Sequence, residues 1–319
     1  MRGPAVSIPN LLHIALPCLL GALLLAHFRA GADEEPASWR AGAERRRIMH
    51  AGRRRSFHVY VPTSCRDGEN VPLVVMLHGG GSNPRNAMRV TGLAAKAERE
   101  GFIAAFPAGS GGFGVFRTWN SGNGCGPAKR RNVDDIGFVS ALIEELCRTH
   151  PVDAGRVYVV GFSNGGMLAH RIGCELGDKV TAIASVSGAL NCDLDEPGRP
   201  VPVLILHGTA DRCVRYEGGK PAFTLRGKKA RRDRSVAEAV AFWTSRNGCA
   251  PPPIREEQGN VVRETYRAAT GTADVVVCTI QGGDHAWPGG KREWPCAPCP
   301  MSELSATDTI WTFFAERRG

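Results

Sequence analysis

Short apolar runs alternate with amphipathic segments along most of this chain. The runs Leu73 to Leu77 and Phe102 to Pro107 are continuously apolar, which is typical of strands covered on both faces. From Asp135 to Cys147, apolar residues recur at helical spacing, which indicates a helix with one buried face. Further strands are expected at residues 56–62, 156–160, 181–186, 201–206 and 275–280, and further helices at 166–172, 235–246 and 307–317. This alternation predicts an α/β fold with a mostly parallel sheet and helices on both of its faces.

The composition favours one large domain over two. The chain has 319 residues, of which 43% are hydrophobic, so it can bury a large core. We expect the domain to span residues 48–319. A glycine-rich segment, Pro107 to Gly126, is predicted to be a long irregular loop, and long loops in compact domains often carry function.

Arginine gives the chain a formal net charge of +9, from 40 basic and 31 acidic residues. Runs of arginine occur at residues 45–47 and 53–55 and within 226–234. Such runs can attract polyanions, for example an acidic polysaccharide or a membrane surface. Because no aromatic interleaving and no nucleic-acid motif accompanies them, we interpret them as solvated loops and expect no nucleic-acid partner.

The N-terminus has the pattern of an export signal. Arg2 supplies a positive charge, an apolar run follows from Leu11 to Phe28, and Ala30 to Ala32 forms an A-x-A cleavage site. We expect a signal peptide at residues 1–32, a flexible segment at 33–47, and a secreted protein, extracellular or periplasmic. The alternative is an uncleaved anchor. The uninterrupted apolar part is short for a bilayer span, so we expect no stable membrane association after cleavage.

The cysteine content agrees with export. Ten of the 11 cysteines lie after the signal, and an even set in an oxidising compartment indicates disulfides. We expect Cys249 to pair with Cys278 and Cys174 with Cys192, because each pair flanks neighbouring elements. Cys296 and Cys299 fit C-x-x-C, but neither a second ligand pair for zinc nor a thioredoxin-like βαβ start is present. We therefore interpret these two as sulfurs of structural disulfides.

The segment Gly161 to Gly165 fits G-x-S-x-G. A predicted strand precedes it and a predicted helix follows it, which is the context of a nucleophile elbow. Glycines are needed there because bulky neighbours would clash with the strand and helix that meet at the strained turn. This context predicts that Ser163 is a nucleophile.

A serine hydroxyl needs a base within hydrogen-bond reach, and the base needs an orienting carboxylate. In α/β-hydrolases these residues follow the serine in the order acid, then histidine, each just after a strand. Asp211 follows the strand at 201–206, and His285 follows the strand at 275–280. His207 competes for the base role and Asp284 for the acid role. Asp284 directly adjoins His285 and is poorly placed to receive its proton, and His207 is expected to pack in the corner between strand and loop.

An acyl-transfer site also needs backbone N–H groups that stabilise the oxyanion. One is expected from Asn164, the residue after the nucleophile. The other is expected from Gly80, in the His78 to Gly81 stretch HGGG that follows a buried strand. Such chemistry requires no metal and no organic cofactor.

Taken together, these motifs resemble the polyhydroxybutyrate depolymerase and feruloyl esterase family, the LpqC-like esterases, whose fold is the α/β-hydrolase fold. The resemblance runs from about residue 48 to 314. The matching stretches are 77–81, 118–120, 133–138, 161–167, 207–211 and 285–289. It implies esterase activity, with Ser163, Asp211 and His285 as the triad. Two segments depart from the expected pattern: the basic stretch 226–234, and the insertion 291–300 that contains the C-x-x-C.

The leading hypothesis is therefore a secreted serine esterase. Its ester is expected to be a short-chain hydroxyalkanoate or, alternatively, a feruloyl or acetyl group on plant polysaccharide. Trp119 and Trp287 are candidate substrate contacts, with ordinary packing in a loop as the alternative. Two hypotheses of other classes are a serine peptidase and a non-catalytic binding protein on the same fold.

Overall fold

The computed structural model describes residues 42–67, 69–112, 116–124, 126–192, 199–222 and 231–318. The expected signal peptide, most of the expected flexible segment, and most of the basic stretch 226–234 lie outside these residues. The strands are β1 (Ala43–His50), β2 (Arg53–Tyr60), β3 (Val71–Leu77), β4 (Ile103–Pro107), β5 (Ser110–Gly112), β6 (Phe116–Thr118), β7 (Val152–Phe162), β8 (Ala182–Val186), β9 (Val203–Gly208), β10 (Ile254–Gln258), β11 (Val261–Tyr266) and β12 (Val275–Ile280). The α-helices are α2 (Pro84–Thr91), α3 (Leu93–Glu100), α4 (Pro127–Arg130), α5 (Asp135–Thr149), α6 (Asn164–Glu175), α7 (Val236–Asn247) and α8 (Ala306–Ala315).

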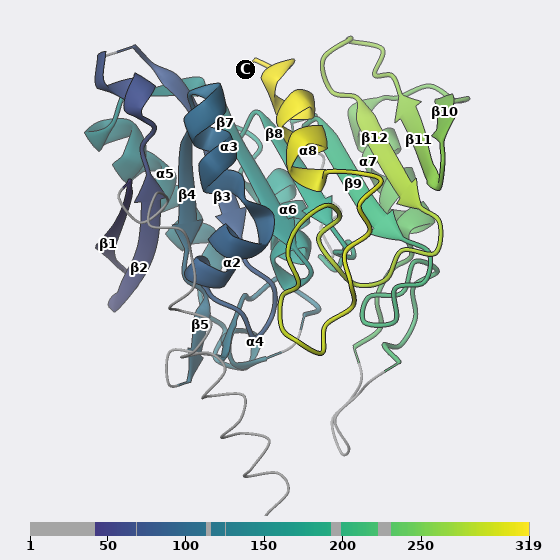
Figure 1. Cartoon of the computed structure of the whole chain (residues 1–319), viewed down its shortest axis with the longest axis horizontal. Coiled ribbons are helices and arrows are strands. Elements are labelled where there is room, and N and C mark those ends of the chain that lie inside the picture. Colours follow the sequence, from purple (N-terminus) through teal and green to yellow (C-terminus); the bar gives the residue numbers. More distant parts are fainter. Residues whose placement is uncertain are drawn as a thin grey trace, which may run out of the picture. The chain divides into compact units, whose positions relative to one another are not determined.

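One large sheet organises the domain (Figure 1). Within the described residues it has ten strands, in the order β1-β2-β4-β3-β7-β8-β9-β12-β11-β10. The six central strands, from β4 to β12 in this order, are parallel to one another, and two antiparallel strands flank them at each edge. The predicted α/β fold with a mostly parallel sheet is confirmed.

Helices cover both faces of this sheet. Helices α2, α3 and α8 lie in front of it in Figure 1, and α5, α6 and α7 lie behind it. The central strands are buried on both faces, which explains their continuous apolar sequences. Among the described residues, no helix has the length and apolar character needed to cross a bilayer.

The structure differs from two of the sequence-based expectations. Residues 43–47 were expected to be flexible, but they belong to β1, which pairs with β2 along its full length, so the compact unit begins at Gly42. The Pro107 to Gly126 segment was expected to be irregular, but β5 and β6 form a small antiparallel sheet within it. Both pairings supply hydrogen-bond partners for backbone that would otherwise be left unpaired.

The expected disulfides are absent from the described residues. All nine cysteines that the structure describes are free thiols. Cys174 and Cys192 are neighbours whose thiols hydrogen-bond to each other. Cys249 and Cys278 have different surroundings. The Cys249 thiol points to the carbonyl of Ala273, whereas the Cys278 thiol is buried beside Arg263. Cys296 and Cys299 are both exposed.

Candidate active site

Ser163 occupies a strained turn between β7 and α6. Its φ and ψ angles are 54° and −117°, in a region that non-glycine residues rarely adopt. The flanking glycines are required by close backbone contacts. A Cβ on Gly161 would lie 2.1 Å from the carbonyl oxygen of Gly165, and a Cβ on Gly165 would lie 2.2 Å from that of Leu77. The turn therefore holds the serine at the carboxyl edge of the sheet.

Two loops at the same edge bring His285 and Asp211 to this serine. The imidazole Nε2 of His285 lies 2.9 Å from Ser163 Oγ, and its Nδ1 lies 2.7 Å from Asp211 Oδ2. The parallel pairing of β9 with β12 places the two loops side by side, since Gly208 pairs with Ile280 at the strand ends. The structure thus joins the three predicted residues in one chain of hydrogen bonds.

The carboxylate of Asp211 is buried and held from several sides. Its Oδ1 accepts hydrogen bonds of 2.8 Å from the backbone N–H groups of both Cys213 and Val214. Burial on its own would raise the pKa of Asp211, but hydrogen bonds from His207 and His285 outweigh burial and hold the pKa well below its ordinary value. Asp211 is therefore ionised at neutral pH and can orient an imidazole.

Neither competing residue has the geometry of a triad member. His207 is buried, and its Nε2 lies 2.7 Å from the carbonyl oxygen of Val214 and 3.4 Å from Asp211 Oδ2, so the proton on this nitrogen faces both acceptors. Asp284 accepts a hydrogen bond from the backbone N–H of His285, and its other oxygen lies 3.6 Å from Arg212. The expectation that His207 packs in the corner between strand and loop agrees with this position.

The HGGG loop lies directly beside the residue after the serine. A Cβ on Gly80 would lie 3.4 Å from Cβ of Asn164, so the two expected oxyanion donors belong to neighbouring segments. At the N-terminus of a helix, the backbone N–H groups have no acceptor within the helix. The N–H of Asn164, the first residue of α6, is therefore available to a ligand.

His78 fixes the start of this loop. Its Nε2 accepts the backbone N–H of Gly109 at 3.0 Å, so the ring proton lies on Nδ1, which donates to the carbonyl of Gly79 at 2.8 Å. Burial lowers the pKa of His78 to about 4, so the ring is neutral at physiological pH. The histidine of the HGGG motif is therefore a structural anchor.

Trp119 supports the loop and does not offer a ring face to substrate. The residue is fully buried, and its indole N–H donates to the carbonyl of His78 at 2.8 Å. The side chain of Asn164 accepts the backbone N–H of Trp119 at 2.7 Å and donates to its carbonyl at 3.2 Å. The expectation of a direct substrate contact is therefore corrected: Trp119 couples the HGGG loop to the start of α6.

Trp287 is corrected for the same reason. Its side chain is buried, its indole N–H donates to Thr307 Oγ1 at 3.0 Å, and its ring meets Phe162 edge-on. The ring of Phe162 also lies 5.0 Å from that of His285. Trp287 therefore ties the loop after His285 to α8 and to the nucleophile turn.

No sequence motif predicts that Glu293 belongs to the site. This residue lies in the 291–300 insertion, and its carboxyl Oε1 would be 3.2 Å from a Cβ on Gly79. Glu293 and Gly79 are more than 200 positions apart in sequence, and no motif links them. The contact follows only from the way in which the insertion folds over α2.

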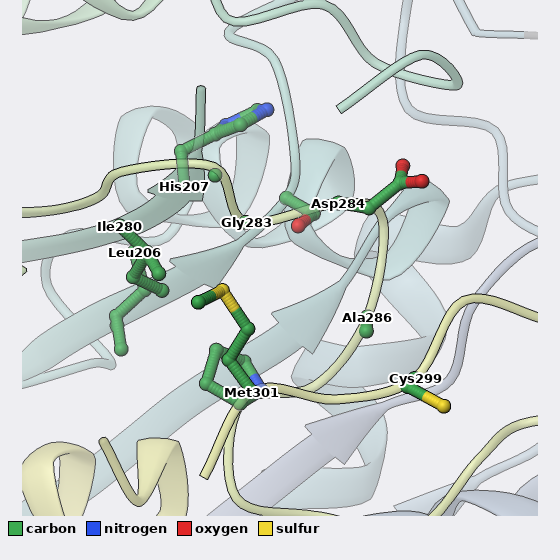
Figure 2. Close-up of a pocket in the computed structure, with 11 residues that line it drawn as sticks. Leu206, His207, Ile280, Gly283, Asp284, Ala286, Cys299 and Met301 are labelled. Atoms are coloured by element: carbon green, nitrogen blue, oxygen red, sulfur yellow. The ribbon is translucent and has the colours of Figure 1, made fainter. Parts of the chain in front are cut away.

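A small pocket lies beside this centre (Figure 2). It is lined by the ends of β9 and β12 and by Asp284, Ala286, Cys299 and Met301, and it includes neither Ser163 nor His285. In Figure 2 the carboxyl group of Asp284 points away from Met301 and Ile280. Cys299 and Met301 line this pocket together with the strand ends, so the segment at 299–301 lies against the ends of β9 and β12.

One cluster of potential metal ligands occurs among the described residues. One ligand atom each from Asp211, Cys213 and His285 lies within 4.8 Å of the others. Two of these residues already hydrogen-bond to each other, and His285 also contacts Ser163. The ligand atoms of Asp211 and His285 are thus already part of the hydrogen-bond chain that ends at Ser163.

Comparisons with known proteins find esterases among the relatives of this chain. The family model described as Esterase PHB depolymerase matches residues 55–197. The protein named "Putative esterase NocK" from Nocardia uniformis subsp. tsuyamanensis is 31% identical over 286 residues, which cover 84% of this chain and 81% of that protein. Feruloyl esterase B of Piromyces equi is 32% identical over 74% of this chain, but the match covers only 43% of that longer protein.

Solved structures resemble the fold at low sequence identity. An acetyl xylan esterase from Aspergillus awamori superposes with a TM-score of 0.59 at 14% identity, covering 85% of this chain and 99% of that one. An S-formylglutathione hydrolase from Agrobacterium tumefaciens gives 0.53 at 14% identity, covering 87% and 96%. These likenesses establish the α/β-hydrolase fold. The extent of the match to its relatives shows that the chain is an esterase and belongs to the polyhydroxybutyrate depolymerase and feruloyl esterase family.

Proposed function

We propose that this protein is a serine carboxylic-ester hydrolase that works through Ser163, His285 and Asp211. The continuous hydrogen-bond chain from Asp211 through His285 to Ser163 is the observation that carries this proposal. His285 Nε2 takes the proton of Ser163 as Oγ attacks the ester carbonyl, and Asp211 stabilises the imidazolium that forms. The N–H groups of Gly80 and Asn164 stabilise the negative charge on the carbonyl oxygen.

The tetrahedral intermediate then collapses. The bond between the carbonyl carbon and the alcohol oxygen breaks, and the imidazolium gives its proton to the leaving alcohol. A water molecule, deprotonated by His285, attacks the acyl-enzyme. The acid leaves, and Ser163 regains its proton. No cofactor takes part in these steps.

Our proposal for the class of the natural ester rests on the family to which the chain belongs. Its members suggest either a short-chain hydroxyalkanoate or an acyl group on plant polysaccharide, and the relatives named feruloyl esterase and acetylxylan esterase support the second. Release of 3-hydroxybutyrate oligomers, ferulate and acetate from matched substrates separates these possibilities. The highest kcat/KM would identify the class.

The signal-like N-terminus supports export of the enzyme. N-terminal sequencing of the protein from the culture medium or periplasm should find a mature chain that begins after Ala32. A cell-associated chain that keeps residues 1–32 would contradict this.

The chemical proposal is tested with short p-nitrophenyl esters. Ser163→Ala should lower kcat by at least about a thousandfold, because no other nucleophile replaces the hydroxyl. A fluorophosphonate probe should label wild-type protein at Ser163, as identified by peptide mass spectrometry. Equal turnover by the wild type and S163A, or labelling elsewhere, would contradict the proposal. Turnover of peptide amides at rates comparable to esters would favour a peptidase.

A further inference from the structure

Glu293 brings a third carboxyl group to the reaction centre, besides those of Asp211 and Asp284. The residue is half-buried, and its Oε1 lies against Gly79, the residue before the proposed oxyanion donor Gly80. It is close enough to His285 for their charges to interact. The proposed mechanism assigns no role to this group, although it lies beside the HGGG loop.

The backbone around Glu293 is fixed by α2. One nitrogen of Arg89, Nη2, donates to the carbonyls of Arg292 and Glu293 at 2.7 and 3.0 Å. Asn86 Oδ1 holds the same guanidinium at 2.7 Å. The backbone N–H of Lys291 donates to the carbonyl of Val90 at 2.9 Å. The insertion is thus attached to the helix that follows the HGGG loop, and the carboxyl group is held at that loop.

No cation forms an ion pair with this carboxyl group among the described residues. The guanidinium of Arg89 is committed to Asn86 and to backbone carbonyls, and that of Arg292 is turned to the thiol of Cys299. The hydroxyl of Ser82 hydrogen-bonds to the carboxyl group and accepts a hydrogen bond from Asn86. Desolvation by burial raises the pKa of Glu293 to about 7, against smaller opposite effects of Ser82, His285 and Arg89.

We propose that Glu293 is a third acidic group of the reaction centre and acts in its neutral form. In that form it adds no negative charge beside the oxyanion hole, and it supplies one O–H donor at the HGGG loop. This inference rests on the proposed esterase mechanism, because it concerns the oxyanion of that mechanism.

The physical reason is the charge that develops during the reaction. The oxyanion forms next to Gly80, and donors fixed in a water-poor site stabilise it most strongly. A carboxylate beside Gly79 would repel the oxyanion, whereas a neutral carboxylic acid would not. A carboxylic acid held neutral near pH 7 can also donate a hydrogen bond to such a centre. Deprotonation of Glu293 should therefore slow acylation.

The test compares pH profiles of kcat/KM for p-nitrophenyl butyrate between pH 5.5 and 8.5. The wild type should lose activity as the pH rises through about 7. Glu293→Gln keeps a neutral donor of the same shape but cannot ionise, so its kcat/KM should not fall between pH 6 and pH 8.5, whereas that of the wild type should fall about tenfold over the same range. Glu293→Ala should also lack the alkaline decline, with lower activity than E293Q throughout. Glu303→Gln, at an exposed acid on the same loop, should keep the wild-type profile.

Thermal unfolding gives a readout that does not depend on turnover. An acid whose pKa is higher in the folded state binds more protons there, so it costs stability as the pH rises from its ordinary value of about 4.3 toward 7. E293Q should therefore gain Tm relative to the wild type between pH 5 and 8.5. A constant Tm difference, or the same alkaline decline in E293Q, would overturn the proposal. Failure of the esterase proposal itself would appear separately, as turnover of the same ester that S163A retains.

Discussion

At the scale of single residues, the arrangement of hydrogen bonds determines which acid can serve the base. Asp211 and Asp284 are both close to His285, and the sequence favoured Asp211 over its competitor Asp284. Asp211 accepts the imidazole Nδ1 proton, whereas Asp284 accepts only the backbone N–H of His285. The burial of Asp211 makes its contact with the imidazole stronger, since charges interact more strongly away from water.

Replacing this acid should therefore separate the two candidates. Asp211→Asn keeps the size of the side chain but presents an amide, which favours the wrong tautomer of His285. We expect kcat to fall by about four orders of magnitude with little change in KM. Steady-state kinetics on p-nitrophenyl esters measures this.

Asp284→Asn is the matched control. It removes a charge at the adjacent position without touching Nδ1, and should change kcat by less than about threefold. A large loss in D284N together with a small loss in D211N would reverse the assignment of the acid.

At the scale of elements, the oxyanion loop depends on contacts that cross between segments. The indole of Trp119 donates to His78 at the start of the HGGG loop, while its backbone pairs with the side chain of Asn164. One residue thus holds both segments that are proposed to supply the oxyanion donors. A change at Trp119 should affect stability and turnover together.

Trp119→Phe tests this coupling. The substitution removes the indole N–H and leaves the buried carbonyl of His78 without this donor, which should cost about 1–3 kcal/mol of unfolding free energy. We also expect kcat to fall about tenfold or more, because the loop loses its position. Urea denaturation and steady-state kinetics measure the two effects.

Trp243→Phe provides the comparison. This buried tryptophan also donates its indole N–H, to His170 Nδ1 at 3.0 Å, but its helix α7 carries no residue of the proposed site. We expect a similar loss of stability with kcat nearly unchanged. Equal kcat losses in both variants would show that Trp119 acts only through general stability.

The limits of sequence-based prediction are clearest at the scale of elements. The central strands were predictable because burial on both faces requires continuous apolar runs. Strands β1 and β10 were missed because they lie at the two edges of the sheet, where exposed and charged residues are tolerated. The β5–β6 pair was missed because strands of three residues have no readable period.

The same reasoning explains which parts of the site were predictable. Ser163, Asp211 and His285 each follow a predicted strand, and parallel strands end at one edge, so their proximity could be anticipated. Glu293 and the supporting contacts of Trp119 depend on how loops dock in three dimensions. No local pattern in the sequence records such docking.

At the scale of the whole molecule, buried histidines connect stability to pH. His78 anchors the HGGG loop, and His170 accepts the indole N–H of Trp243 inside the core. Burial lowers the pKa of each to about 4, below the ordinary value of 6.5. Both rings are therefore neutral in the folded protein at pH 7.

These shifts set the sign of the acid response. Between pH 6.5 and 4 the unfolded chain binds protons at these histidines and the folded chain does not, so stability falls as the pH falls through this window. Each shift corresponds to a loss on the order of 3 kcal/mol, complete near pH 4. Chemical denaturation at pH 7 and pH 4.5 should show a large drop in unfolding free energy.

His170→Gln isolates one of these contributions away from the reaction centre. Glutamine can still accept a hydrogen bond from Trp243 but does not titrate. The variant should therefore be less stable than the wild type at pH 7, where packing is disturbed, and should lose less stability on going to pH 4.5. Parallel loss in the two proteins would show that His170 is not the group that titrates. A smaller loss in H170Q would place acid sensitivity in the core, apart from the chemistry at Ser163.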